Sequence, residues 1–204
     1  MKTIFDLLSS SQFRKRPAMF IGDNDLRTLE TWIQGYISAC DDAGTYDCLK
    51  SKYGVDIRDF RDYIAYWENL SNARGFAALL KELSHCQTDE AWKLFFEYLD
   101  RFSELKIVKQ QRLELTDQRK EYAQNWLSLI TVHIISPEGD IIQREPRFTE
   151  IHKTMFSEGI CRLDIIGDNF YPSDPFFPSN IFHTEEEVDE ELLRIFGDIE
   201  WETI

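Results

Sequence analysis

The sequence predicts an α+β protein, in which a helical N-terminal half is followed by a small antiparallel sheet and an acidic C-terminal helix. Up to Phe102, apolar residues recur at three- and four-residue steps, which is the period of amphipathic helices. From Leu127 the pattern changes to short runs rich in Ile, Val and Thr, as is typical of strands. Near the C-terminus, Thr184 and Glu187 form a capping-box pattern, and Gly197 follows as a helix stop.

Separate amphipathic helices are expected in the first half. They cover Leu26 to Cys40, Asp56 to Trp67, Arg74 to His85 and Thr88 to Phe102. Asp23 or Asn24 is expected to cap the helix from Leu26, because short polar side chains accept hydrogen bonds from a first turn. Each apolar stripe is one face wide, so these helices should pack on one another.

The second half is expected to hold a hairpin and a third strand. Leu127 to Ser136 and Ile141 to Glu145 flank a Pro-Glu-Gly-Asp turn, which is the pattern of a hairpin. Ile160 to Ile166 has the composition of another strand. The three prolines between Phe170 and Pro178 exclude regular helix or central strand there. Residues 103–125 fit either a strand or a broken helix.

The negative charge is concentrated near the C-terminus. The chain of 204 residues carries 23 Lys and Arg against 37 Asp and Glu, a net charge of −14. From Asp164 onward there are 12 acids and a single base, Arg194. Such a surface repels nucleic acid and anionic membranes, and it raises the encounter rate with basic proteins. We therefore predict a helical region over 1–125 and a small acidic α+β region over 126–204, packed together as one unit.

The composition favours a folded cytoplasmic protein. No stretch approaches the roughly 20 apolar residues that span a bilayer, and Asp6 comes too early for a secretory signal. The cysteines lack both a C-x-x-C pair and matching His spacing, so they are expected to be buried or partly buried thiols rather than disulfides or zinc ligands. They are Cys40, Cys48, Cys86 and Cys161.

The sequence contains no recognisable catalytic motif. It has no G-x-S-x-G, no phosphate-binding Gly-rich loop, no H-E-x-x-H and no EF-hand loop. Glu150 and His152 would share one face of a strand, but no nucleophile stands beside them in the sequence. The sequence therefore predicts no enzyme, no metal site and no cofactor.

Residues 14–23, Arg-Lys-Arg-Pro-Ala-Met-Phe-Ile-Gly-Asp, are the most specific string in the chain. They resemble the R-K-R-P-G-M-Y-I-G segment of gyrase-type topoisomerase ATPase subunits. Those ATPases need an acidic residue and an Asn on the helix that follows. Leu26 to Tyr36 lacks that pattern, so nucleotide hydrolysis is not expected.

A wider resemblance covers residues 1–105. The similar elements are a short helix at Phe5 to Ser9, an R-P-x-M-[YF]-[IL]-G loop at Arg16 to Gly22, a helix ending in Gly-Tyr at Leu26 to Tyr36, and an aromatic helix at Ala91 to Phe96. Together they resemble a group of poorly characterised bacterial proteins suggested to be immunity proteins of interbacterial toxin systems. The resemblance implies a chain that inhibits a toxin by binding it.

The motif loop is expected to serve the fold, with partner binding as the alternative. Its residues are Arg16, Pro17, Met19, Phe20, Ile21 and Gly22. The Arg-Pro pair would end the preceding helix, the three apolar residues would pin the loop to the core, and the glycine would allow the next turn. Arg16→Ala or Gly22→Val should then lower stability. Ala18 stands where the related group has Gly, which disfavours a positive φ at that position.

Partner recognition is predicted in the last fifth of the chain. Phe170 to Phe182 places five aromatic residues among prolines, which would give rigid apolar anchors beside an acidic steering surface. The predicted contact residues are Phe170, Tyr171, Asp174, Phe176, Phe177, Glu186, Asp189 and Glu190. Alternatively, the aromatic residues cover the sheet and the acids are solvated. Reversing the three helix acids to Lys is expected to leave folding almost intact.

These features lead to the hypothesis of a protein-binding inhibitor. The favoured form is an immunity protein, or antitoxin-like chain, that neutralises a toxin with a basic surface, such as a nuclease. One alternative is a regulatory or structural interaction module without a toxin partner. Another is a nucleic-acid mimic that offers carboxylates in place of phosphates.

Overall fold

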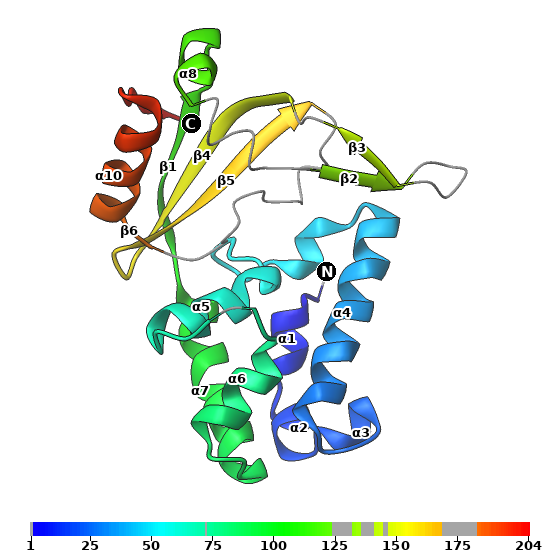
Figure 1. Ribbon diagram of the computed structural model, residues 1–204. Coiled ribbons are helices and arrows are strands. Elements are labelled where there is room, and N and C mark those ends of the chain that lie inside the picture. Colours follow the sequence, from blue (N-terminus) through cyan, green and yellow to red (C-terminus); the bar gives the residue numbers. More distant parts are fainter. Residues whose placement is uncertain (1, 72, 124–131, 136–140, 145–146, 169–182) are drawn as a thin grey trace. The chain divides into compact units, whose positions relative to one another are not determined.

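The computed structural model describes residues 2–71, 73–123, 132–135, 141–144, 147–168 and 183–204 (Figure 1). The chain divides into two compact units, Met1–Ile107 and Val108–Ile204. The first unit is helical, and the second combines strands and helices. This confirms the predicted α+β class. The boundary between the two units lies after Ile107 rather than after residue 125, where it was predicted. Residues 108–125 therefore belong to the second unit.

Five helices of the first unit follow expected segments, whereas two short helices within residues 11–21 and a 3₁₀ turn over residues 46–49 were not predicted. The helices are α1 (Ile4–Leu8), α2 (Ser11–Lys15), α3 (Ala18–Ile21), α4 (Leu26–Ala43), α5 (Phe60–Trp67), α6 (Phe76–Leu83) and α7 (Thr88–Glu104), with 3₁₀ turns η1 (Tyr46–Leu49) and η2 (Ile57–Asp59). The cap of α4 is Asp25, whose side chain accepts from the Arg27 N–H. This corrects the expected cap at Asp23 or Asn24. Asp23 instead accepts from the Asp25 N–H at 3.0 Å and the Thr28 hydroxyl at 2.9 Å.

Aromatic side chains fill the core of the first unit. Phe60 of α5 contacts Phe95 and Phe102 of α7, with ring centroids 5.7 and 5.4 Å apart. Phe76 of α6 lies 5.7 Å from Phe95, and Tyr63 lies 5.2 Å from Phe102. All five rings are buried. The apolar stripes of α5, α6 and α7 therefore pack on one another, as their spacing predicted.

A side chain of α4 caps the first turn of α6, and the sequence pattern does not reveal this contact. The Glu30 carboxylate of α4 accepts the backbone N–H groups of Phe76 and Ala77 in the first turn of α6. Burial raises the pKa of this carboxyl above its ordinary value. Gly75 leaves the space for it, because an added Cβ there would lie 2.2 Å from Glu30 Oε1.

The second unit is built around a five-stranded sheet in the order β6-β5-β4-β1-β7 (Figure 1). Its strands are β1 (Ile107–Glu114), β4 (Arg147–Phe156), β5 (Ile160–Asp168), β6 (His183–Thr184) and β7 (Glu202–Thr203), and β2 (Val132–Ile135) pairs with β3 (Ile141–Arg144) as a separate antiparallel hairpin. Strand β5 pairs antiparallel with both β4 and β6. Helices α8 (Asp117–Tyr122) and α10 (Glu185–Phe196) complete the unit.

One face of the sheet packs against α10. The shared core contains Ile151 of β4, Leu163 of β5, and Val188 and Leu192 of α10. Helix α10 begins at the predicted capping box, in which Thr184 and Glu187 bond reciprocally, and it ends at Gly197 with φ 77°. The predicted acidic helix is therefore confirmed in its bounds.

The second unit agrees with the sequence prediction in some segments and differs from it in others. The hairpin β2–β3 and the strand β5 agree with the prediction, and the ambiguous residues 103–125 form the end of α7, β1 and α8. Strands β4, β6 and β7 were not predicted. The start of the expected first strand, the hairpin turn and the Phe170 to Pro178 segment lie outside the described residues. None of the described helices is both long and apolar enough to cross a bilayer.

Candidate partner-binding surfaces

Two of the predicted acids lie on an exposed stripe of α10. Glu186, Glu190 and Leu193 follow one another at four- and three-residue steps, so they share one face of the helix. All three are exposed, and Leu193 keeps 52% of its surface accessible. Neither glutamate forms an ion pair with another residue in the part of the chain that the structure describes. The stripe thus joins two predicted contact residues to an apolar neighbour that the prediction lacked.

Asp189, the third predicted acid, is bound to a buried lysine instead. Its Oδ1 accepts from Lys153 Nζ at 2.8 Å and from Trp201 Nε1 at 2.9 Å. The Lys153 side chain on β4 is 0% exposed. Its ammonium also donates to Glu185 Oε1 at 3.2 Å and lies 4.4 Å from the centre of the Trp201 ring. The expectation that reversing this acid would leave folding intact therefore does not hold for Asp189.

Tyr122 extends the exposed stripe beyond the end of α10. A Cβ at Gly197 would lie 3.1 Å from Tyr122 Cζ, so the ring covers the backbone where the helix stops. Gly197 lies one helical turn after Leu193, and its N–H donates to the Leu193 carbonyl. Tyr122 nevertheless remains 65% exposed. We call Glu186, Glu190, Leu193 and Tyr122 the α10 surface.

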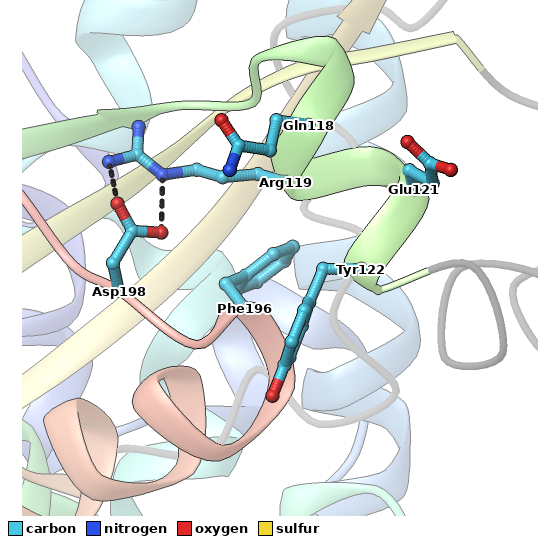
Figure 2. Close-up of a pocket in the computed structure, with 6 residues that line it drawn as sticks. All are labelled: Gln118, Arg119, Glu121, Tyr122, Phe196 and Asp198. Carbon is cyan, nitrogen blue, oxygen red and sulfur yellow. Dashed lines mark hydrogen bonds and ion pairs between the residues drawn. The ribbon is translucent and has the colours of Figure 1, made fainter.

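A shallow hollow of ≈ 230 Å³ lies beside Tyr122 (Figure 2). Its lining residues are Gln118, Arg119, Glu121, Tyr122, Phe196 and Asp198. Arg119 forms the ion pair drawn in Figure 2, with Nε and Nη2 at 3.3 and 3.0 Å from the Asp198 carboxylate oxygens. Its Nη1 also donates to the Glu114 carbonyl at 2.8 Å. These bonds hold α8 at the end of α10, and so they fix the position of Tyr122.

The five other predicted contact residues cannot be placed on this surface. Phe170, Tyr171, Asp174, Phe176 and Phe177 all fall within 169–182, which lies outside the described residues. Their assignment as partner contacts stays a prediction. Among the described residues, the exposed Tyr122 and Leu193 lie beside the acids, and sequence reasoning missed both. A signal for Leu193 was present, because it falls in register with the two acids along the helix.

The R-P-x-M-F-I-G motif forms a short helix whose apolar side chains are not buried. Arg16 ends α2, Pro17 precedes α3, and Gly22 ends α3 with φ 93°. Within α3 no residue is buried, and Met19 is 74% exposed. Phe20 is 40% exposed, and its ring lies 5.5 Å from the ring of the fully buried Phe13. The expectation that the apolar residues pin this loop to the core was therefore wrong for Met19, whereas Phe20 does contact a core ring.

A second shallow hollow, of ≈ 350 Å³, lies next to the motif. It is lined by Ile21, Arg27, Thr28, Thr31 and Trp32. The Trp32 ring stacks on Tyr36 one turn further along α4, with centroids 5.8 Å apart. Arg27 is the one charged residue that lines this hollow, and Asp23 accepts from the hydroxyl of its lining residue Thr28 at 2.9 Å.

Gly22→Val is expected to lower the free energy of unfolding by about 1–2 kcal/mol, because a side chain at positive φ strains the backbone. Nothing lies within 4 Å of an added Cβ there, so the loss would come from the backbone rather than from a clash. Arg16→Ala should cost less than about 0.5 kcal/mol, since its exposed side chain reaches only Met19 Sδ, at 4.0 Å, among the described residues. Chemical denaturation measures both. Equal losses would contradict this assignment.

Three further kinds of site were candidates: the Glu150–His152 pair, the cysteines and a group of metal ligands. Glu150 and His152 share a face of β4 as expected, with Oε2 and Nε2 3.0 Å apart. Three of the four free cysteines are buried, but Cys86 is exposed, contrary to expectation. Burial raises the pKa of the Cys161 thiol to about 12, so this thiol stays protonated at neutral pH. No three His, Cys, Asp or Glu residues among those described are grouped to hold a metal ion.

Comparison with known proteins gives no relative for this chain: no family model, no curated protein and no solved structure matches it.

Proposed function

We propose that this chain is a protein-binding inhibitor of the immunity type, which neutralises a toxin with a basic surface in the bacterial cytoplasm. The observation that supports this most is the α10 surface. It places exposed Tyr122 and Leu193 beside two exposed carboxylates that have no cationic partner among the described residues. Aromatic and aliphatic side chains next to charge are typical of protein-binding hot spots.

The charge distribution supports a basic partner. The last fifth of the chain carries 12 acids and one base, and α10 alone contributes six of these acids in a single helix. Such a field accelerates association with a positively charged protein and repels nucleic acid. The resemblance of residues 1–105 to suggested immunity proteins favours a toxin as that partner over a regulatory one.

The test uses the product of the neighbouring reading frame as the candidate partner, because toxin and immunity genes are adjacent. Co-expression with this chain should restore growth if that product is toxic. In binding kinetics, Glu186→Lys with Glu190→Lys is expected to slow association about tenfold at low salt and to weaken its salt dependence. Leu193→Ala or Tyr122→Ala should instead raise the dissociation rate about tenfold.

A matched control variant separates the effect of the α10 surface from the effect of the net charge. Asp42→Lys with Asp47→Lys makes the same change in net charge on exposed positions of the first unit. This variant should keep its association rate within about twofold. Equal slowing by both variants would show that only total charge matters. Unchanged kinetics for all α10 variants would place the interface elsewhere. The surface around the exposed Met19 side chain would then be the next one to test.

A further inference from the structure

Two of the free cysteines meet where α4 ends. Cys40 lies in the last turn of α4, and Cys48 lies in the 3₁₀ turn η1 that follows. Gly44 ends the helix with φ 64°, and the Thr45 N–H donates back to the Cys40 carbonyl at 2.9 Å. The Cys48 thiol in turn donates to the Thr45 carbonyl. These bonds fold the chain back on itself, so both cysteines lie in one corner of the first unit.

The two thiols of this corner are direct neighbours. Cys40 and Cys48 lie within hydrogen-bonding distance of each other, and the Tyr36 hydroxyl, one turn before Cys40 on α4, lies within that distance of both sulfurs. Cys40 is 7% exposed and Cys48 is 4% exposed. Two sulfurs in mutual contact are the starting geometry that a disulfide requires, because a bridge cannot form between side chains that point apart.

The surroundings of the pair determine how it reacts. Burial, followed by the hydrogen bond with Cys48, raises the pKa of the Cys40 thiol above its ordinary value. Burial likewise raises the pKa of Tyr36 to about 12. Since the thiolate is the reactive form of cysteine, the folded pair reacts slowly. Gly44 and Thr45, which separate the cysteines along the chain, are exposed, so local opening of this turn brings the sulfurs to a reagent while the helical core stays folded.

We infer that Cys40 and Cys48 are a reversible thiol–disulfide pair, which a low-molecular-weight disulfide such as oxidised glutathione converts to a bridge in the folded chain. One cysteine, as its thiolate, attacks the S–S bond of the reagent, forms a mixed disulfide and releases one thiol after protonation. The other cysteine then attacks the sulfur of the first, which forms the bridge and releases the second thiol. The chain loses two electrons and two protons, and the reagent becomes two thiols. Both cysteines belong to the first unit, so this inference does not depend on the α10 surface or on the proposed function.

The test incubates the folded Cys86→Ser chain with oxidised glutathione, alkylates the remaining thiols in denaturant and digests the chain with trypsin. The exposed Cys86 is replaced so that it does not link one chain to another. Trypsin cleaves after Lys and Arg, so Cys40 and Cys48 stay together in the peptide of residues 28–50. Mass spectrometry should show that this peptide has lost two hydrogen atoms and carries no alkyl group. Cys161, which has no cysteine beside it among the described residues, should stay reduced and be alkylated.

Thermal unfolding and two variants show whether the bridge forms in the folded state. A bridge that closes the loop 40–48 should raise the melting temperature by about 5–10 °C, and dithiothreitol should reverse the rise. Cys40→Ala and Cys48→Ala, each in the Cys86→Ser chain, should show neither the mass change nor the shift, and either one decides if the other does not fold.

Three results would overturn the inference. The peptide of residues 28–50 would stay fully alkylated, it would carry glutathione instead of an internal bridge, or the bridge would form only when the oxidation is carried out in denaturant. The last result would show that the folded corner does not hold the two sulfurs in a geometry that can react.

Discussion

Asp189→Lys is expected to unfold the second unit, or to lower its free energy of unfolding by more than about 3 kcal/mol. Lys153 is fully enclosed, and its ammonium lies 2.8 Å from Asp189 and 3.2 Å from Glu185. The substitution removes the nearer anion and adds a cation beside the buried charge, and Glu185 alone cannot compensate both. Trp201 donates to the same carboxylate, so its fluorescence during chemical denaturation reports the change directly.

Matched variants on the same helix separate this effect from a general loss of acidity. Glu186→Lys and Glu190→Lys make the same charge change at exposed positions, and each should stay within about 0.5 kcal/mol of the parent. Lys153→Met should cost less than Asp189→Lys, because it removes the buried charge and keeps most of the side-chain volume. A loss in Glu190→Lys as large as in Asp189→Lys would contradict this account.

Helix α10 could be predicted in full because its signals are local. Thr184 and Glu187 bond to each other across three residues, and Gly197 ends the helix through its own backbone conformation. The lysine site could not be predicted in this way. It joins Lys153 to an acid 36 positions away, which in turn bonds an indole 12 positions further along the chain. Contacts between separate elements leave no trace in local periodicity.

The same lysine explains why β4 was missed. Its core-facing positions are Ile151, Lys153 and Met155, so the expected apolar alternation is interrupted by a charge at the central buried position. Pattern reasoning treats a lysine as exposed. The short strand β7, Glu202–Thr203, was missed for another reason, since two residues are too few to show any period.

For the R-P-x-M-F-I-G motif, the sequence predicted the backbone better than the burial of the side chains. The spacing of the motif correctly predicted the turn at Gly22, which depends on backbone geometry. Arg16 does end a helix, but that helix is α2, which was not predicted, and the first helix already ends at Leu8. The burial of Met19 could not be judged from the sequence. An apolar residue is usually taken as core, yet exposed apolar residues also occur at binding surfaces. Leu193 differs from Met19 in this respect, since its register with Glu186 and Glu190 along the helix was a signal of exposure in the sequence.

Phe95→Ala is expected to cost about 3–5 kcal/mol of unfolding free energy, the range for truncating a buried Phe. Phe95 is 0% exposed, and four rings surround it, with centroids between 5.2 and 5.8 Å away. The truncated side chain would leave a cavity among α5, α6 and α7 that rigid rings fill poorly. Phe20→Ala is the control, because its ring is 40% exposed, and it should cost less than about 1 kcal/mol.

Hydrogen exchange on the Phe95→Ala variant then shows where the stability is lost. Amides of α5 to α7 should lose protection by an amount equal to the full loss of unfolding free energy, because their shared core has been weakened. Amides of β4 and β5 belong to the other compact unit, with its own core around Ile151 and Leu163, and they should keep most of their protection. A uniform loss across both units would instead show that the chain unfolds as a single cooperative body. A cost below that of Phe20→Ala would contradict the packing assigned to the first unit.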